Sequence, residues 1–444
     1  MRRHPIILYT AIIAVCYLYT GSAYMSQFYR LMEFYDGTTV DIITSGWNYL
    51  LQAAGIGLFC LGLWKKPDVF RKKTLFAVLL ATGALFMAAS QLAQTGLGVV
   101  LSGYVFELHI GMYFGFYLTM FAGHVPVECA GLCYGAAYAV GSVGTYILSL
   151  IGDGAFLVSK VVVFVYIALA LLTEGLVLAA EDIDTGREQT TAADKKPELR
   201  YLVPVVAVMM VISVVGSGLY YSMPQARDVD WNLIRAFYAM GLVLAGIVMD
   251  RSRLIGDICA AASLAYPLIV MALIGEGVTN TVTMGLSYAV RGFLSVYYVL
   301  AFTDIGAEQP ARLPLAPVGL LIARVVEAIL SLLLMWWEVP EVLQLVFSAV
   351  IFLPLLILFV LLQNRKYAAP PVSEERRYAM FAEQYNLTAR ESQILRCLAE
   401  GLSDDEIAGR CYISKSTVRF HISNMLKKTE SKSRVDVIRK LEKS

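Results

Sequence analysis

The sequence predicts an all-α protein in which a polytopic bundle of twelve membrane-spanning helices is followed by a small polar domain. Hydrophobic residues make up 58% of the 444 residues and charged residues only 16%, which is more apolar surface than a soluble core can bury. Long, nearly uncharged runs fill residues 6–362 and stop at Gln363. The last 33 residues instead carry nine Lys and Arg against three Asp and Glu. Most of the chain is therefore expected in lipid, with a basic end of different chemistry.

The membrane spans are predicted from apolar runs, since about 20 helical residues cross the hydrocarbon core of a bilayer. Twelve such runs begin near Ile6, Ile42, Leu75, Leu97, Pro126, Phe156, Tyr201, Asn232, Ile255, Asn280, Leu315 and Glu341. The first run has the cations and small flanking residues of a secretory signal. Because eleven further runs follow it, an uncleaved first helix is the better interpretation.

Cations that flank the spans predict the orientation, because cytoplasmic loops carry an excess of Lys and Arg. With the N-terminus inside, the inner segments hold sixteen Lys and Arg, and the outer loops hold only Arg30, Lys160 and Arg227. We therefore expect a multi-pass protein of a bacterial cytoplasmic membrane, with its N- and C-termini in the cytoplasm.

A polar stretch between spans six and seven divides the membrane domain, residues 1–362, into two parts. We expect two six-helix halves, residues 1–180 and 200–362, joined by a cytoplasmic linker at residues 181–199. A division of this kind is typical of membrane proteins built from two homologous bundles.

The loops after spans two and eight share a pattern. The second loop contains Gly246, Asp250, Arg251 and Arg253, and the first has a reduced counterpart at Asp68, 182 positions before Asp250. This pattern resembles the loop motif of the major facilitator superfamily, which implies two six-helix bundles around a central cavity. The second glycine of the family motif is missing and the first copy has lost most of it. The resemblance therefore supports the fold more strongly than transport.

In that superfamily spans one, four, seven and ten line the cavity, so polar residues on these spans are candidate ligand contacts. Glu107 and His109 lie on span four, and Arg291 lies on span ten, 182 positions after His109. We hypothesise that these three residues form a polar centre for an amphipathic or aromatic small molecule. The expected wall on span one consists of Tyr9, Tyr17, Thr20 and Tyr24. Alternatively, Arg291 and Glu107 pair only to hold the two bundles together.

Other reactive side chains of the spans are interpreted as structural. Arg324 and Glu327, three positions apart on span eleven, are expected to satisfy each other on one helix face. The seven cysteines are scattered and are expected to be reduced. Cys129 and Cys133 lie one helical turn apart, but no further Cys or His stands at ligand spacing. We expect neither a metal nor a cofactor.

The polar C-terminal part is predicted to contain a connector at residues 363–386 and a helical domain at residues 387–444. Thr388 and Glu391 have the spacing of a capping box, which starts a helix. Gly401 can adopt the left-handed conformation that ends this helix. Helical patterns thus begin immediately after the connector.

A second capping box, Ser403 and Glu406, opens a short helix that ends in a tight turn at Tyr412. Ser414 can then cap a third helix over residues 415–429. The inner face of this helix is predicted to carry Val418, Ile422 and Met425, and its outer face Ser416, Arg419, Phe420, Ser423 and Lys427. A short helix, a tight turn and a basic helix are typical of a helix-turn-helix, whose second helix enters the major groove.

The most specific signal of the domain is a set of residues at fixed spacing. They are Leu387-Thr388-Ala389-Arg390-Glu391, Leu395, Gly401-Leu402-Ser403, Glu406-Ile407-Ala408, Ile413-Ser414, Thr417-Val418-Arg419, His421, Asn424, Lys428 and Ser433-Arg434. This set resembles the LuxR-type DNA-binding domain. The resemblance implies three contacts to base edges and three to phosphates. The expected contacts to base edges are Arg419, Phe420 and Ser423. The expected contacts to phosphates are Lys415, Thr417 and Lys427.

The sequence departs from that family at two places. Asp404 and Asp405 stand where the family has a neutral residue and a basic one. Thr429 and Ser431 stand where the family has apolar residues, so we expect a looser join to the last helix, residues 433–441. That helix dimerises in the family, which implies a homodimer on a two-fold site in double-stranded DNA.

These observations favour a membrane-bound one-component transcription regulator that senses a small molecule and binds promoter DNA. No phosphoacceptor domain is evident, so the signal is expected to come from the membrane half. One alternative is a transporter of the major facilitator type with a regulatory tail. Another is a basic tail that binds anionic lipid or protein. We expect no enzyme activity, since no nucleophile or acid stands at workable spacing from His421.

Overall fold

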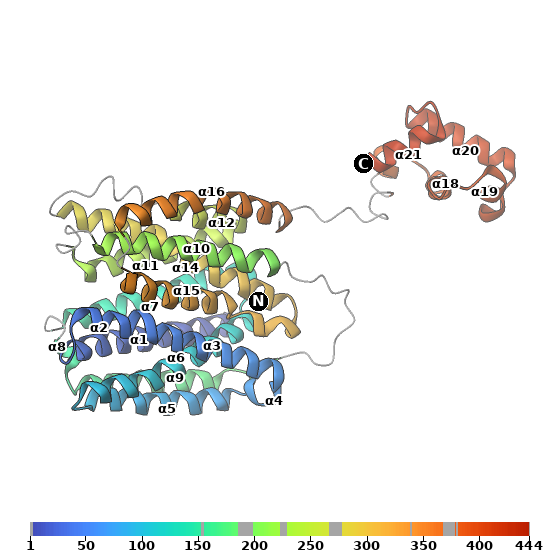
Figure 1. Ribbon diagram of the computed structural model, residues 1–444. Helices are drawn as coiled ribbons and strands as arrows, with labels where there is room; N and C mark the ends of the chain where they lie inside the picture. Colours follow the sequence, from blue (N-terminus) through green and yellow to red (C-terminus); the bar gives the residue numbers. More distant parts are fainter. Residues whose placement is uncertain are drawn as a thin grey trace. The chain divides into compact units, whose positions relative to one another are not determined.

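The protein, for which a computed structural model was analysed, consists of two compact units, Met1–Lys366 and Tyr367–Ser444. The structure describes residues 3–151, 155–184, 199–222, 229–265, 278–337, 340–366, 378 and 381–443. Within these residues the regular structure is helical throughout (Figure 1). Most of the expected linker (185–198) and of the expected connector (367–377, 379 and 380) lies outside the described residues.

The first half of the membrane unit contains six long helices. They are α1 (Arg3–Met32), α3 (Asn48–Lys65), α5 (Lys73–Leu92), α6 (Gly96–His124), α7 (Val127–Leu150) and α9 (Val162–Ala179). Four shorter elements accompany them, namely α2 (Gly37–Asp41), the π-helix η1 (Ile42–Trp47), α4 (Pro67–Phe70) and α8 (Ala155–Val158). Helix α3 continues η1 without a break, and together they form the second predicted span.

The second half contains α10 (Leu199–Ser222), α11 (Trp231–Arg251), α12 (Arg253–Ala262), α14 (Val278–Glu308), α15 (Val318–Trp337) and α16 (Glu341–Lys366). Helices thus lie at all twelve predicted places. In the part of the chain that the structure describes, eight helices are both long and apolar enough to cross a membrane. Four of the helices at these twelve places, α7, α10, α12 and α16, fall outside that set. Residues 266–277, which follow α12 and η3 (Ser263–Ala265), are not described.

Large apolar side chains face outward along the membrane unit. Trp64, Phe164 and Trp336 are among the most exposed of them. A soluble protein rarely leaves so many such residues in water, whereas in a bilayer they meet lipid while the helices satisfy their own backbone. The protein is therefore a multi-pass membrane protein.

Glycine allows the two halves to touch backbone to backbone. Where α7 crosses α11, a Cβ placed on Gly246 would lie 2.4 Å from the carbonyl oxygen of Gly131. A Cβ on Gly135 would lie 2.3 Å from the carbonyl oxygen of Leu242. Only residues without a side chain permit such an approach between membrane helices. Gly246 of the loop pattern is thus required by the contact between the halves.

The C-terminal unit packs four helices around its own core, α18 (Ala389–Ala399), α19 (Asp404–Cys411), α20 (Lys415–Lys428) and α21 (Arg434–Lys443). Both predicted capping boxes are formed, at Thr388 and at Ser403. Gly401 has a φ of 79°, and the Ser414 side chain caps α20. These predicted helix signals are confirmed, as is the buried face of Val418, Ile422 and Met425.

The join between α20 and α21 is tighter than the sequence suggested. Thr429 is fully buried, and its hydroxyl donates to the Met425 carbonyl at 2.7 Å and lies 3.0 Å from Ser431 Oγ. Lys440 of α21 donates to the Thr429 carbonyl at 2.6 Å. The expectation of a looser join was wrong, because hydrogen bonds replace the apolar packing that these polar residues cannot supply.

Candidate DNA interface and intramembrane polar centre

The outer face of α20 carries the residues that the sequence assigned to DNA. Six of these side chains are exposed and Thr417 is partly exposed; the six are Lys415, Ser416, Arg419, Phe420, Ser423 and Lys427. Phe420 is 61% exposed, although an aromatic ring gains most when it is buried. An exposed ring within a polar face can be buried against a binding partner.

Two acidic residues of α19 hold basic residues of this face. Asp404 Oδ2 lies 3.0 Å from Arg419 Nε, and Asp404 Oδ1 lies 2.5 Å from a terminal nitrogen of Arg434. Asp405 Oδ2 lies 2.7 Å from Lys415 Nζ. Burial opposes the charged form of Asp404, but the contacts with Arg419 and Arg434 outweigh it and hold its pKa below the usual value. The sequence pattern indicates that both aspartates are unusual, but it does not predict their partners.

An ion pair between a buried glutamate and a partly exposed lysine joins α18 to α20. The Glu391 side chain is only 3% exposed, and its Oε2 lies 2.6 Å from Lys428 Nζ while it also accepts the backbone N–H of Thr388. Burial favours the neutral acid, but these contacts outweigh it and lower the pKa of Glu391. The pair fixes the helix that presents the candidate DNA-binding residues.

In the membrane unit, Arg324 of α15 lies at a meeting point of both halves. Its guanidinium contacts Glu327 at 2.6 Å, so the predicted pair is confirmed. The same group lies over the ring of Tyr49 on α3, 4.5 Å from its centroid. Tyr49 in turn stacks with Tyr24 of α1 at 6.2 Å. Tyr298 of α14 also lies within electrostatic range of the guanidinium. A cation of the second half thus sits against aromatic side chains of the first.

Glu107 of α6 is fully buried and only partly satisfied. Its Oε2 accepts a hydrogen bond from Gln52 Nε2 of α3 at 2.6 Å. Within the described residues, Glu107 Oε1, Gln52 Oε1 and Arg324 Nε have no hydrogen-bond partner. Leaving a buried polar group unpaired costs about 1–3 kcal/mol. Two acceptors and one donor in this region therefore have unused hydrogen-bonding capacity.

His109 lies on the other side of α6. Its Nε2 is 3.2 Å from Thr82 Oγ1 of α5, and its Nδ1 contacts the Val105 carbonyl at 2.7 Å. Residues two positions apart on a helix point in directions that differ by about 200°. His109 therefore cannot share the face that Glu107 presents to α3. The structure therefore does not bring His109 and Glu107 together.

Arg291 lies over the ring of Tyr288 on its own helix, with its guanidinium carbon 5.8 Å from the ring centroid. The repeat offset gave His109 and Arg291 equivalent places in sequence, but it did not determine which neighbour each side chain faces. The centre of the site is better marked by Arg324, whose signal in the sequence was a charge in the middle of span eleven.

Tyr17 belongs to a chain of tyrosines that passes from one half to the other. Its hydroxyl lies 2.7 Å from that of Tyr134, and its ring stacks on Tyr138 of α7 at 4.1 Å. Tyr138 meets Tyr238 of α11 edge to face at 5.6 Å. The Tyr238 hydroxyl then donates to Ser295 of α14 at 2.7 Å. Tyr17 and Tyr24, two of the four predicted wall residues, thus lie in aromatic contacts between helices.

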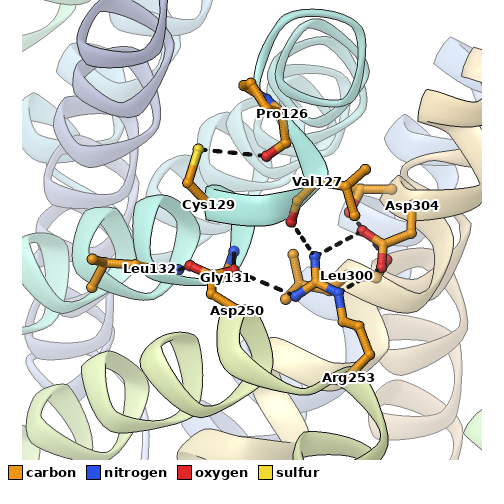
Figure 2. Close-up of polar contacts among 10 residues, drawn as sticks. Pro126, Val127, Cys129, Gly131, Leu132, Asp250, Arg253, Leu300 and Asp304 are labelled. Atoms are coloured by element: carbon orange, nitrogen blue, oxygen red, sulfur yellow. Dashed lines mark hydrogen bonds and ion pairs between the residues drawn. The ribbon is translucent and has the colours of Figure 1, made fainter. Parts of the chain in front are cut away.

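The loop pattern after α11 builds a polar latch between the halves, shown in Figure 2. Both carboxylate oxygens of Asp250 accept backbone N–H groups of α7, from Gly131 and Leu132, each at 2.7 Å. Arg253 donates to the Val127 carbonyl at 2.8 Å and pairs with Asp304 of α14 at 2.9 Å. A carboxylate at the first turns of a helix is favoured by the helix dipole. Arg251 is exposed.

The first copy of the pattern makes different contacts. Asp68 lies on the surface, 3.9 Å from Arg71 of the same turn. Beside it, Asp182, which follows α9, pairs with Lys72 at 2.8 Å and accepts the backbone N–H of Lys73 at 2.9 Å. The hydrogen bond from Lys72 lowers the pKa of Asp182. Lys72 and Lys73 of this loop are therefore tied to the end of the first half.

Comparison with known proteins places the C-terminal unit. Residues 385–441 match the family described as bacterial regulatory proteins, luxR family. The C-terminal unit is a LuxR-type helix-turn-helix domain. It is 50% identical over 50 residues to the nitrate/nitrite response regulator protein NarL of Escherichia coli K12, an alignment that spans 11% of this chain and 23% of NarL. The transcriptional regulatory protein DesR of Bacillus subtilis is 34% identical over 77 residues, which span 17% of this chain and 37% of DesR.

The membrane unit is similar to solved transporters. The E. coli fucose:proton symporter FucP superposes with a TM-score of 0.55 at 11% identity, over 80% of this chain and 98% of FucP. The proton:xylose symporter XylE superposes with a TM-score of 0.58 at 12% identity, over 83% of this chain and 97% of XylE. At such identities the likeness shows the fold alone. The predicted fold class, a major-facilitator-like bundle followed by a LuxR-type domain, is confirmed. The matching family model describes regulatory proteins, and the solved structures with a similar fold are transporters.

Proposed function

We propose that this protein is a one-component transcription regulator of a bacterial cytoplasmic membrane, which senses a small molecule in its membrane unit and binds promoter DNA. One observation carries the proposal: a LuxR-type domain with an exposed basic recognition face shares a chain with a unit of the major facilitator fold. DNA binding requires the C-terminal unit in the cytoplasm. The predicted topology, with both termini inside, satisfies this requirement.

In this proposal α20 enters the major groove and α21 joins two copies on a two-fold site. Arg419, Phe420 and Ser423 read bases, and Lys415, Thr417 and Lys427 hold phosphates, with Ser416 beside them. Val435 of α21 supports the dimer, because this apolar side chain is 63% exposed while Val437 and Leu441 of the same helix face the core. An exposed apolar residue on a short helix is what a second copy would cover.

The ligand is proposed to bind near Arg324, Glu107 and Gln52, with Tyr24 and Tyr49 as an aromatic wall. Acceptor oxygens without partners favour a ligand that carries N–H or O–H donors, and the tyrosine rings favour an apolar or aromatic body. Arg291 remains a candidate on α14, and its role is proposed to be secondary. His109 is not retained, since its contacts lie toward α5.

The signal is proposed to travel through the contact between the halves. A ligand shifts an equilibrium only if its affinity differs between two states. The tyrosine chain and the Asp250 latch both cross from one half to the other, so they are the contacts that a second state would break. The state of the bundle would then change how two DNA-binding domains pair.

A second candidate function is a transporter whose C-terminal domain regulates it. The buried carboxyl of Glu107 favours this candidate, because intramembrane acids often serve as proton sites. Uptake into proteoliposomes separates the two functions. Saturable, gradient-driven uptake would support the transporter, whereas ligand binding without uptake would support the sensor.

Chromatin mapping of the tagged full-length protein tests the main proposal. We expect discrete occupied promoters that are lost in an Arg419→Ala variant whose membrane level is unchanged. Glu400→Gln provides a matched control, because it breaks an exposed ion pair with Arg410 that lies outside α20. Occupancy that survives Arg419→Ala at every site would reject promoter recognition by α20 and favour a tail that binds lipid or protein.

A further inference from the structure

We propose that the two aspartates at the start of α19 tune DNA recognition, Asp404 as a positioning residue for Arg419 and Asp405 as a competitor of phosphate for Lys415. The inference rests on the proposed DNA-binding function and adds residues that lie outside the recognition helix. Together the two contacts weaken sequence-independent attraction and favour sequence-dependent binding.

The contacts of these aspartates are not the ordinary ones of a helix start. Acidic residues in a first turn usually stabilise a helix through its dipole or by capping. In α19, Ser403 and Glu406 already form the capping box. The Asp404 carboxylate instead contacts two other helices and is only 11% exposed, although it is the first residue of a surface helix. Its role therefore concerns Arg419 and Arg434.

Asp404 contacts Arg419 through an atom that is not needed to recognise a base. The contact uses Nε, 3.0 Å from Asp404 Oδ2, while the Arg419 side chain stays 65% exposed. A bidentate contact to guanine can use the two terminal nitrogens of the guanidinium. A long side chain that is already oriented loses less rotamer freedom when it binds. Asp404 should thus strengthen binding to the right sequence through Arg419.

The same carboxylate also contacts Arg434, the first residue of α21, at 2.5 Å. One buried charge therefore links a base-reading side chain of α20 to the helix proposed to pair two copies. Displacement of α21 would alter the position of Arg419 through Asp404. Dimer geometry and base reading are coupled by this network.

Asp405 acts on a different step. Its contact with Lys415 at 2.7 Å joins two exposed side chains, so it adds little to folding stability. Lys415 opens α20, where backbone N–H groups and a cation together attract phosphate. A DNA phosphate must compete with Asp405 for this lysine, and the aspartate itself repels the backbone. The net positive charge offered to any duplex is therefore reduced.

A weaker electrostatic attraction to DNA suits a domain that is attached to a membrane. Tethering raises the effective concentration of the domain toward nearby DNA without a new contact. Sequence-independent binding, which is mainly electrostatic, would then hold the domain on any neighbouring duplex. Low charge on α19 and α20 keeps occupancy dependent on sequence.

Asp405→Asn gives the first test, in full-length protein reconstituted in nanodiscs. Anisotropy titrations with one 30-bp duplex of arbitrary sequence are run over a series of salt concentrations. We expect several-fold tighter binding at low salt and a salt slope steeper by about one, the value for one additional phosphate contact. Glu400→Gln, which removes an exposed acid at the Arg410 ion pair of the same domain, should change neither quantity. An unchanged slope in Asp405→Asn, or an equal change in Glu400→Gln, would overturn the role of Asp405.

A double-mutant cycle of Asp404→Asn with Arg419→Ala gives the second test. The specific duplex is selected from a random library with the wild-type protein. We expect Asp404→Asn to reduce the ratio of specific to non-specific affinity about tenfold in the wild-type background and to leave it unchanged in the Arg419→Ala background. A loss of equal size in both backgrounds, in step with a lower Tm, would reduce Asp404 to a structural residue.

The two proposals fail in different ways. Selection that enriches no sequence with the wild-type protein would reject promoter recognition, and the non-specific titration of Asp405→Asn would still decide the role of that residue. Enrichment together with two null variants would instead leave the DNA-binding function standing and reject the tuning by α19.

Discussion

Each unit of this protein buries a glutamate, and the two are satisfied to different degrees. Glu391 of the DNA-binding domain has a lysine, Lys428, and a backbone N–H as partners. Glu107 of the membrane unit has one hydrogen bond from Gln52 and an oxygen without a partner. A fully paired buried carboxylate holds helices together, whereas a half-paired one keeps capacity for another molecule. The difference separates a structural charge from a candidate binding group.

Glu391→Gln should have the largest effect on stability. It leaves the ammonium of Lys428, whose side chain is 34% exposed, without its carboxylate, and loss of a hydrogen bond to a charged group costs about 1.5–3 kcal/mol. Chemical denaturation of the C-terminal unit within the full chain, followed by tyrosine fluorescence, measures the change. Glu400→Gln is a matched control, because it makes the same chemical change at an exposed ion pair with Arg410 in the same domain.

The same pair predicts how stability depends on pH. The pKa of Glu391 in the folded protein lies below its ordinary value of 4.5, so the pair contributes fully above pH 4.5 and is lost as the pH falls through the folded value. The difference in unfolding free energy between the wild type and Glu391→Gln should therefore shrink below pH 4.5. A constant difference down to pH 3 would mean that the Lys428 charge pair is not its source.

Asp250→Asn tests whether the latch holds the halves together. The variant loses the charge that binds two N–H groups of α7, an effect of about 2 kcal/mol. Cys129 lies on the same turn of α7 (Figure 2). Its alkylation by a maleimide, followed by mass spectrometry, should accelerate several-fold. Asp68→Asn, in the first copy of the pattern, should leave the rate unchanged, and an equal acceleration there would erase the distinction between the two loops.

The two units also differ in how far the sequence predicted them. Capping boxes, the Gly401 turn and the face of α20 depend on residues within four positions, and all of them could be predicted. The spans could be placed for the same reason, since hydropathy is a local property. Asp404 and Arg419 stand fifteen positions apart, and Arg324 and Tyr49 come from different halves. Such contacts depend on which faces pack, and the sequence pattern does not contain that information.

The repeat offset shows this limit most clearly. It gives His109 and Arg291 equivalent positions in the sequence, but the helices packed around α6 and α14 decide which neighbours each side chain contacts. His109 meets Thr82 on α5, whereas Glu107, two residues earlier, meets Gln52 on α3. The spacing of two positions already implies that the two side chains point about 200° apart on a helix. The sequence alone could therefore have assigned His109 and Glu107 to different faces.

Tyr412→Gly should stabilise the DNA-binding domain slightly. Tyr412 has a φ of 54° in the turn before α20 and is 95% exposed. A left-handed conformation costs a residue with a Cβ about 1 kcal/mol, and little packing is lost here. The midpoint of denaturation should rise accordingly, with DNA affinity unchanged. A lower midpoint would show that the tyrosine ring has contacts that its exposure does not suggest.

Glu107→Gln should have the smallest effect on stability, less than about 1 kcal/mol in either direction. The amide has the same shape and its oxygen can still accept from Gln52, while no charge has to be buried. Its effect should appear in function. If Glu107 Oε1 binds a donor of the ligand, the variant reaches the membrane at a normal level, occupies its promoters without ligand, and no longer responds to ligand.

Glu391→Gln gives the contrast that makes this result informative. There the same chemical change should lower stability and leave the ligand response of the surviving protein intact. A Glu107→Gln variant that unfolds instead would show that its carboxylate, like that of Glu391, is part of the framework. The unpaired oxygen would then be a cost of the fold rather than a place for a ligand.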